Sequence, residues 1–557
     1  MDEAEHWRRA GRLLVAKAVA ELGYEELLRP EPDAAGYRVA GHTFAATRGG
    51  CGHWTVDPHS VRRDGAEATD PVRFLLDAAP ALGLDGLRLA EAVDEMTATW
   101  AADARLLATT PTAAALADAG TAELESWQQG HPGMVLNKGR LGFSAADAAA
   151  YAPESGRTFC LPWIAVDESL AGHHGVPADR LLAEELDDDT RARFSAACPR
   201  PGHVWLPVHP YHLDHVVRTL FAPYLADGRV VELGEAPDAY RPLASVRTLV
   251  NTDHPLRRTV KLPLQIRNTL VWRGLPADTT AEAPAVTGWL RGIRDADPYL
   301  RDVTRFDILG EVASVAVTHP AYAEVPDAPY RYHELLGAVW REPVEAHLAA
   351  GERARSLAGL LQVGSDGRAL VIELVDRSGR DATGWLTGLA HAVLPGLLHF
   401  LHAYGVAFCP HGENTVVVYD TDGVPDRILV KDLADDVNVL PSTEAPRLLL
   451  RWPHEELAHS ILSALVAGHF RHLAPLVEEH LGVPEQAFWR LLRAEVDAYR
   501  ETFPATASDP YGLTAAEFGR VVLNTEQLTS GAFHDRAEKD EAFDEISGTV
   551  RNPLAEV

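Results

Sequence analysis

The densest group of chemically active side chains lies in residues 245–273, which read SVRTLVNTDHPLRRTVKLPLQIRNTLVWR. This stretch has six Lys or Arg residues and one acid, in a chain whose net charge is −29. Alternating apolar and polar residues predict two strands joined through 251–258. Such a hairpin places Ser245, Arg247 and Lys261 on one polar face. We therefore predict an anion-binding site here, because clustered cations are suited to holding phosphate or carboxylate groups.

A second polar group lies at the ends of another predicted hairpin. The segment GVAFCPHGEN, residues 405–414, leads into a strand at 415–419, and a turn at 421–425 precedes a strand at 427–432. The ends of paired strands lie close together, so His411, Glu413 and Asn414 are expected beside Asp432. Carboxylates there are suitable Mg²⁺ ligands when a substrate supplies the remaining oxygens. The alternative interpretation is a surface hairpin with polar ends.

A third candidate is the glycine-rich segment 130–142, GHPGMVLNKGRLG. It interrupts a helical pattern and offers three phosphate ligands, His131, Lys138 and Arg140. On spacing alone, a loop with a solvated basic pair fits equally.

A metal site is the weaker interpretation of the histidines. His209, His212 and His215 recur at every third position, a spacing that places side chains on one helix face. Pro210 disfavours helix at His209, however, and no HExxH pattern is present. His399 and His402 are expected on a long helix beside a core.

Length and composition limit the remaining choices. A chain of 557 residues predicts two to four domains. The strong negative charge argues against nucleic acid and anionic membranes as partners. Four scattered cysteines predict neither a disulfide framework nor a cysteine metal site. We find no secretory signal, no apolar run of about 18 residues and no P-loop or Rossmann motif, and therefore expect a cytoplasmic protein.

The elements that carry these groups follow from hydrophobic periodicity. Residues 1–125 are predicted to be mostly helical, with a small hairpin within 37–56. Residues 305–317 predict a strand and 330–341 a helix. A long helix is expected over 384–404, and helices again after 452.

Five segments together resemble a known family. They are GHPGMVLNKGRLGF, LPVHPYH, SVRTLV followed by KLPLQIRNTLVWR, HGENTVVVYDTDGVPDRILVKDL, and the terminal RNPL. In this order and spacing, over residues 120–554, they resemble the NRPS-independent siderophore synthetases of the aerobactin-synthetase (IucA/IucC) family.

The resemblance implies an α+β fold of hand-like shape, with antiparallel sheets flanked by helices. The thumb would be residues 1–125, the fingers 126–330 and the palm 331–557. The implied reaction uses ATP and Mg²⁺ to convert citrate, a citrate derivative or another polycarboxylic acid into an acyl adenylate. An amine or alcohol then gives an amide or ester in siderophore biosynthesis. Whether the protein forms a homodimer is left open, although dimers are frequent in this family.

The resemblance also implies roles for individual residues. ATP contacts are expected from His131, Lys138, Arg140, Ser245, Arg247, Thr248, Lys261 and Asn414. Substrate contacts are expected from Thr269, Arg273, His411 and Glu413, and metal ligands from Glu413 and Asp432. Lys261, Arg273 and His411 are the predicted catalytic residues.

Several positions depart from the family pattern. Met134 and Val135 replace a second His-Pro, Glu413 replaces glutamine, His212 stands where glutamine is expected, and Lys431 stands where arginine is common. These departures put the usual citrate specificity in question. They also leave two alternatives, a non-catalytic relative that binds carboxylate or nucleotide, and a histidine-rich metalloenzyme.

Overall fold

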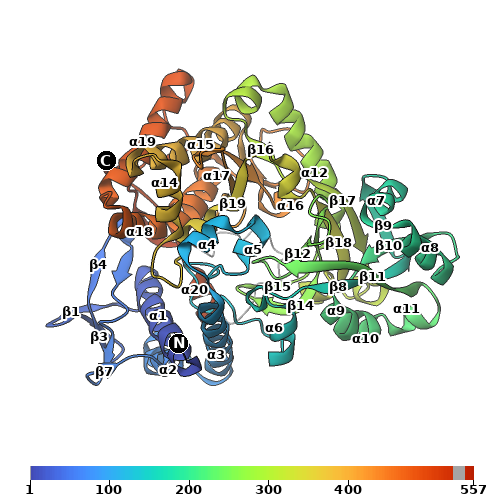
Figure 1. The fold of residues 1–557 in the computed structure, drawn as a ribbon, viewed down its shortest axis with the longest axis horizontal. Coiled ribbons are helices and arrows are strands. Elements are labelled where there is room, and N and C mark those ends of the chain that lie inside the picture. The colour runs from blue at the N-terminus through green and yellow to red at the C-terminus, as the bar shows by residue number, and fades with distance from the viewer. Residues whose placement is uncertain (1, 531–545) are drawn as a thin grey trace.

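Helices and antiparallel sheets form three lobes that meet at the centre of the molecule (Figure 1). The structure is a computed structural model, and it describes residues 2–530 and 546–557. The N-terminal lobe contains the helices α1 (Glu3–Tyr24), α2 (Pro71–Leu82) and α3 (Gly86–Thr109), with a small five-stranded sheet at its outer edge. The mixed helix and sheet architecture confirms the predicted α+β class.

The central lobe is an eight-stranded, fully antiparallel sheet. Its spatial order is β10 (His203–Pro207), β8 (Phe159–Asp167), β11 (Val230–Pro242), β12 (Thr248–Asn251), β13 (Thr259–Lys261), β18 (Leu336–Arg341), β17 (Glu311–Val317) and β9 (Ala171–Gly175). The helix α12 (Ala277–Ala296) packs on β17. The sheet has its own apolar core, which includes Trp163 and Trp340.

The basic hairpin is confirmed as β12 and β13, with Thr248 opposite Lys261. The alternation over 259–268 does not continue in one sheet, however. The chain leaves it at Pro263 and forms a separate hairpin from β14 (Leu264–Asn268) and β15 (Val271–Arg273). Val260 therefore packs in the sheet core, while Leu264 packs in a smaller apolar cluster.

One predicted element is wrong. Residues 330–341 were expected to form a helix, but they contain the strand β18 between β13 and β17. All six residues of β18 are buried, and apart from Arg341 they are apolar or glycine, so no alternation shows in the sequence. This strand lies after residue 330 but belongs to the central sheet. The division into domains at residues 125 and 330 stays a prediction.

The C-terminal lobe surrounds a four-stranded sheet in the order β16 (Asp307–Ile308), β22 (Pro425–Val430), β21 (Thr415–Tyr419) and β19 (Arg353–Ser356). The β21–β22 pair confirms the second predicted hairpin. The long helix α15 (Ala382–Tyr404) packs on β22. Asp381 caps its first turn, and Gly405, with φ of 62°, ends it in the left-handed conformation.

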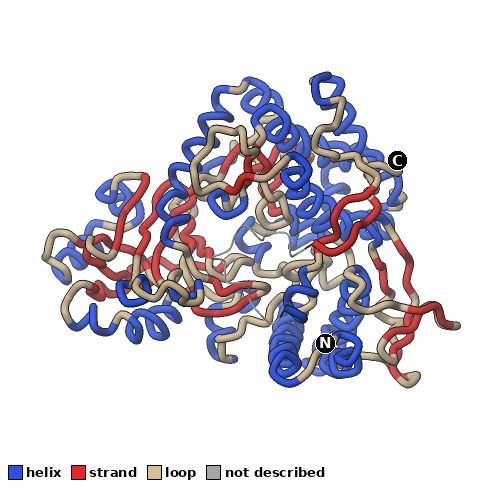
Figure 2. The backbone as a smooth tube through the Cα atoms, turned by 180° about the vertical axis from the view of Figure 1, so that it is seen from behind, coloured by secondary structure: helices blue, strands red, loops and turns tan. Residues whose placement is uncertain are grey.

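Two helical segments have the length and apolarity to span a membrane, Ala382–Tyr404 and His454–Leu481. In their most apolar windows, 78 % and 72 % of the residues are buried inside the protein. Both segments lie in the C-terminal lobe seen from behind in Figure 2, where they supply the apolar core that also joins the N-terminal helices. Burial of this extent is typical of core helices.

Candidate active site

The basic hairpin and the acidic end of the second hairpin meet in one network of charges. The Nζ atom of Lys261 lies 2.9 Å from Asp432 Oδ1 and 3.0 Å from Asp435 Oδ2. Arg341, at the end of β18, also donates to Asp432 and lies 3.3 Å from Glu311. We call Lys261, Arg341, Glu311, Asp432 and Asp435 the charge network. It joins the central sheet to the C-terminal lobe across 171 positions of sequence.

Burial makes this network electrostatically strong. Burial disfavours the charge on Asp432, but Arg341 and Lys261 outweigh it and hold the pKa of this carboxyl well below its usual range. Burial likewise opposes the charge on Lys261, and the two carboxylates raise its pKa above the ordinary value. Lys261 is therefore charged at neutral pH. Two of its three N–H donors are used by these carboxylates.

Asp432 has a left-handed backbone conformation, with φ of 61°. It lies at the start of the short helix α16 (Leu433–Asp436), which carries Asp435 and Asp436. Asp436 accepts a hydrogen bond from Asn414 Nδ2. The turn thus directs three carboxylates to the strand ends where Asn414 and Lys261 lie.

His411 lies beside this acidic turn. Its Nδ1 accepts a hydrogen bond from the Glu413 N–H at 3.2 Å. Burial lowers the pKa of His411, while the charges of Glu413 and Asp432 act in the opposite direction. The Arg273 charge also lowers this pKa, which places Arg273 near His411. His411 is therefore suited to exchanging a proton in a site that also contains a guanidinium.

One of the three candidate residues of the glycine-rich segment, His131, lies near His411. Burial lowers the pKa of His131 to about 3, and His411 is its next largest influence. Lys17 Nζ, from α1, donates to the His131 carbonyl at 2.7 Å. The N-terminal lobe therefore reaches the site through a residue that the sequence did not single out.

The other two basic residues of the segment lie in ion pairs with neighbouring acids. Lys138 is buried and lies 2.7 Å from Asp103. Arg140 is buried and lies 2.6 Å from Glu154. A solvated basic pair is thus excluded, and their role toward ATP stays a prediction.

The remaining candidates lie in the turn before β12 and on the β14–β15 hairpin. Ser245 Oγ accepts from the Thr248 N–H at 3.2 Å and closes the turn that directs Arg247 inward. Arg247 is buried and donates to the carbonyl of Gly274. Arg273 donates to Thr269 Oγ1. Thr248 lies opposite Lys261 in the sheet, and the Arg247 charge acts on Lys261. The bond from Arg247 to Gly274 links this turn to the hairpin that carries Thr269 and Arg273.

Three residues near the site were missed. Asp435 lies three positions after Asp432, and the acidic run KDLADD is a sequence signal that points to it. Arg341 was hidden by the wrong helix prediction. Glu125 is 3 % exposed and accepts from the Ala244 N–H at 3.1 Å. Burial raises its pKa, and Glu413 raises it further, so the two carboxyl groups are neighbours.

Two departures from the family pattern are packing residues. Met134 and Val135 are each 2 % exposed, and the Val135 N–H donates to Asn524 at 2.8 Å. His212 is buried and its Nε2 donates to the Leu335 carbonyl at 2.6 Å. Burial lowers its pKa to about 4, so it is uncharged. Neither change leaves an unfilled position at the site.

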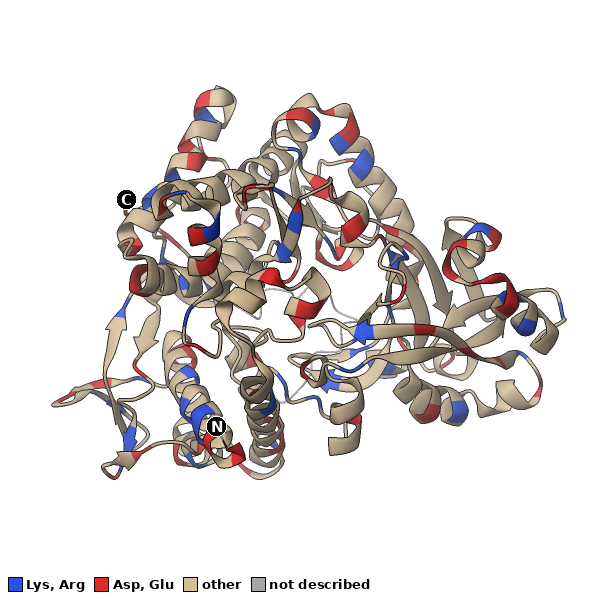
Figure 3. Ribbon diagram, in the orientation of Figure 1, with Lys and Arg blue, Asp and Glu red and all other residues tan. Residues whose placement is uncertain are grey.

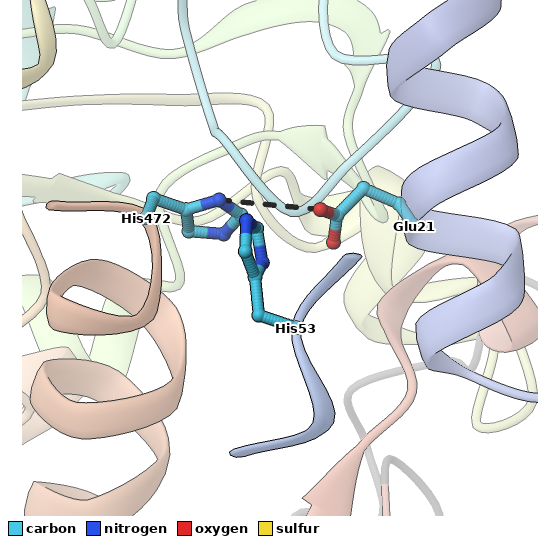
Figure 4. A group of neighbouring side chains, drawn as sticks. All are labelled: Glu21, His53 and His472. Atoms are coloured by element: carbon cyan, nitrogen blue, oxygen red, sulfur yellow. Dashed lines mark ion pairs between the residues drawn. The ribbon is translucent and has the colours of Figure 1, made fainter. Parts of the chain in front are cut away.

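Among the described residues, one group has ligand atoms close enough together to hold a metal ion, and it differs from the predicted histidine group, His209, His212 and His215. It consists of Glu21, His53 and His472, from α1, the segment before β5 (Trp54–Val56) and α18 (Arg471–Leu481) (Figure 4). Arg471 lies 2.8 Å from Glu21 and 3.2 Å from His53 Nδ1. Its guanidinium holds the carboxylate that a metal would need and repels a second cation. The group is therefore an arginine-centred ion pair.

Outside the charge network, charged residues are dispersed over the molecule. Figure 3 shows acidic and basic positions intermixed along most helices and strands. The active-site cluster therefore differs from its surroundings by burial, not by belonging to a basic face.

Comparisons with known proteins identify the class to which this fold and site belong. The IucA / IucC family model matches residues 120–362, and a model described as ferric iron reductase FhuF-like transporter matches residues 383–535. The rhizobactin siderophore biosynthesis protein RhbF of Rhizobium meliloti is 32 % identical, over 99 % of this chain and 96 % of its own. Aerobactin synthase of Escherichia coli is 33 % identical over 94 % of each chain.

Solved structures agree. Aerobactin synthetase IucC of Klebsiella pneumoniae superimposes with a TM-score of 0.88 at 30 % identity, covering 100 % of this chain and 99 % of its own. ATP-bound aerobactin synthetase IucA of the same organism shares the fold, with a TM-score of 0.75 at 17 % identity, covering 98 % and 99 %. The fold is that of the siderophore synthetases. The chain belongs to the IucA/IucC family, which favours the predicted synthetase over the non-catalytic and metalloenzyme alternatives.

Proposed function

We propose that this protein activates a carboxyl group of citrate, a citrate derivative or a related polycarboxylic acid with ATP, and joins it to an amine or hydroxyl group. The observation that supports this most is the buried Lys261 ammonium, which faces the carboxylates of Asp432 and Asp435 beside an uncharged His411. Both reactants of the first step are anions, so fixed cations are required to hold them together.

In the first step, a carboxylate oxygen of the acid attacks the α-phosphorus of ATP and pyrophosphate leaves. Lys261 and Arg247 stabilise the charge that grows on the phosphate oxygens. Arg273, supported by Thr269, holds a carboxylate of the acid through two parallel hydrogen bonds. In the second step the nucleophile attacks the acyl carbon, AMP leaves, and His411 accepts the proton that the nucleophile loses.

The donor set also fits Mg²⁺. The Glu413 carboxylate is half-buried and forms no ion pair with any described residue, and Asp432 lies close to His411 as well. Glu413 would hold the ion together with Asp432 Oδ2, because Lys261 and Arg341 both contact Oδ1 of Asp432, and phosphate oxygens would be the other ligands. Mg²⁺ bound there would neutralise phosphate charge. Glu413, which stands where the family pattern has glutamine, would thus add a metal ligand.

The direct test is carboxylate-dependent ATP–pyrophosphate exchange over a panel of polycarboxylic acids. We expect exchange with citrate or a citrate monoamide, and amide or ester formation when an amine or alcohol is added. Folded protein that binds ATP but exchanges no pyrophosphate with any acid would contradict the proposal.

Replacing Arg273 by lysine should weaken binding of the carboxylic acid. Lysine keeps the charge but offers no planar pair of donors, and the loss of one hydrogen bond to a charged group is about 1.5–3 kcal/mol. We expect KM for the acid to rise by one to two orders of magnitude while kcat changes little. Arg305→Lys, in an exposed pair with Asp426, is the matched control, and an unchanged KM in Arg273→Lys would contradict the assignment.

A further inference from the structure

A separate cavity of about 600 Å³ opens in the C-terminal lobe, away from the charge network. Its walls come from α12, the end of α15, the start of α17 (His454–Ile461) and the loops around residues 440–444 and 505–511. These helices lie in the upper half of Figure 1. Ligand pockets in proteins have volumes of roughly 300–1,000 Å³, so this cavity has room for a small molecule.

Five residues of its lining carry aromatic rings. Trp289, Tyr404, Tyr511, His402 and His454 all contribute. The His402 and His454 rings each lie 5.0 Å from the Tyr511 ring. Burial lowers the pKa of His402 to about 4, so this imidazole is uncharged at neutral pH.

Among the residues that the structure describes, the only Asp or Glu side chain that lines the cavity is the exposed Glu444. No Lys or Arg is among these lining residues. Behind the wall, Asp297 accepts a hydrogen bond from Tyr404 Oη at 2.7 Å. Burial opposes its charge, but the bonds from Tyr404 and His399 lower the pKa of Asp297 to about 2. The phenol is therefore polarised by a negative charge.

Hydrogen bonds hold the rings in place. Trp289 Nε1 donates to the Glu444 carbonyl at 3.1 Å. Tyr511 Oη donates to the Leu401 carbonyl at 2.8 Å. The cavity is thus built from fixed aromatic groups and does not depend on mobile surface side chains.

Two paired strands of a three-stranded sheet lead from the cavity wall toward the proposed active site. The strand β20 (Val406–Ala407) runs from Gly405 in the cavity wall toward His411, and β23 (Asn438–Val439) runs from Asp436 to Leu440, which is also in the wall. The strands pair, with Val406 opposite Val439.

We propose that this cavity binds an organic ammonium ion with a short aliphatic chain. Aromatic faces attract cations through their quadrupole, by about 0.5–2 kcal/mol per ring. The Glu444 carboxylate adds a direct opposite charge, and the aliphatic chain covers the apolar part of the wall. The cavity is distinct from the site that would take the amine as a nucleophile.

The test uses choline and its uncharged isostere 3,3-dimethylbutan-1-ol, titrated into the full chain by calorimetry without ATP or acid. We expect choline to bind at one site, at least tenfold more tightly than the alcohol. Glu444→Gln should weaken choline binding several-fold, and Ser442→Trp, which fills the cavity from an exposed wall position, should abolish it. Glu455→Gln, an exposed carboxylate on α17 outside the lining, is the matched control.

Two further measurements separate this cavity from the active site. Lys261→Ala should keep choline binding, and Ser442→Trp should keep carboxylate-dependent pyrophosphate exchange. Equal affinity for choline and the alcohol, absence of choline binding, or binding unchanged in both cavity variants would overturn the proposal. None of these outcomes depends on whether the protein forms an adenylate.

Discussion

Replacing Lys261 by methionine is expected to lower the rate of carboxylate-dependent pyrophosphate exchange by about 10²- to 10³-fold, the usual cost of removing one donor that stabilises transition-state charge. The side chain is 8 % exposed and lies between Asp432 and Asp435. Methionine keeps the length of the aliphatic chain and removes only the ammonium group. The loss should therefore appear in kcat with native-like circular dichroism.

Removal of this ammonium acts in two ways. It deletes the cation that we propose contacts the phosphates, and it leaves Arg341 as the remaining ion-pair partner of Asp432 while Asp435 loses a partner. The second effect repels ATP from the cleft, so KM for ATP should rise as well. Steady-state exchange kinetics measure both quantities.

Arg257→Ala is the control for this experiment. Arg257 lies on the same hairpin but pairs with Asp238, outside the charge network. Its loss should leave exchange within a factor of two. Exchange that survives in Lys261→Met at the wild-type rate would show that the phosphate site lies elsewhere.

The sequence predicted the two hairpins of the site because each has a partly polar face and a clear turn. The signal failed at β18, where polar and apolar residues do not alternate and a helix was predicted instead. Burial alone does not explain the difference, since β12, β13 and β21 are buried throughout and were predicted correctly. Arg341 ends that strand and was lost with it. Local pattern thus finds strands that alternate in polarity or flank a clear turn, and it misses a strand such as β18 that does neither.

Pairing across long distances could not be predicted from the residues alone. Nothing in the spacing of Lys138 and Arg140 shows that Asp103 and Glu154 neutralise them. The contact between Lys261 and Asp432 likewise depends on how two sheets pack. The family resemblance indicated that these segments share a site, but their mutual distances required the fold.

The same limit applies to the histidines. Spacing favoured His209, His212 and His215 as the metal candidate, but burial and backbone partners account for His209 and His212. His215 stacks on Tyr211, with ring centroids 4.0 Å apart. The group with closely spaced ligand atoms combines residues 21, 53 and 472, which no local pattern connects.

The ion pair between Glu21 and Arg471 gives the second large predicted effect, which is on the free energy of unfolding. Glu21→Gln is expected to destabilise the protein by about 3–5 kcal/mol, because it leaves the Arg471 guanidinium buried without its opposite charge. Both side chains are 3 % exposed, and the guanidinium also lies 3.7 Å from the Tyr24 ring. The thermal unfolding midpoint should fall clearly.

The control is Glu5→Gln on the same helix, where the partner Arg8 is exposed and the midpoint should not change. The double replacement Glu21→Gln with Arg471→Met should recover part of the loss, since it removes the unpaired charge. A bound metal predicts a different pattern, in which EDTA lowers the midpoint of the wild type and has no effect on Glu21→Gln. The ion pair requires that EDTA leaves the wild type unchanged, because Arg471 already neutralises the only carboxylate of the group.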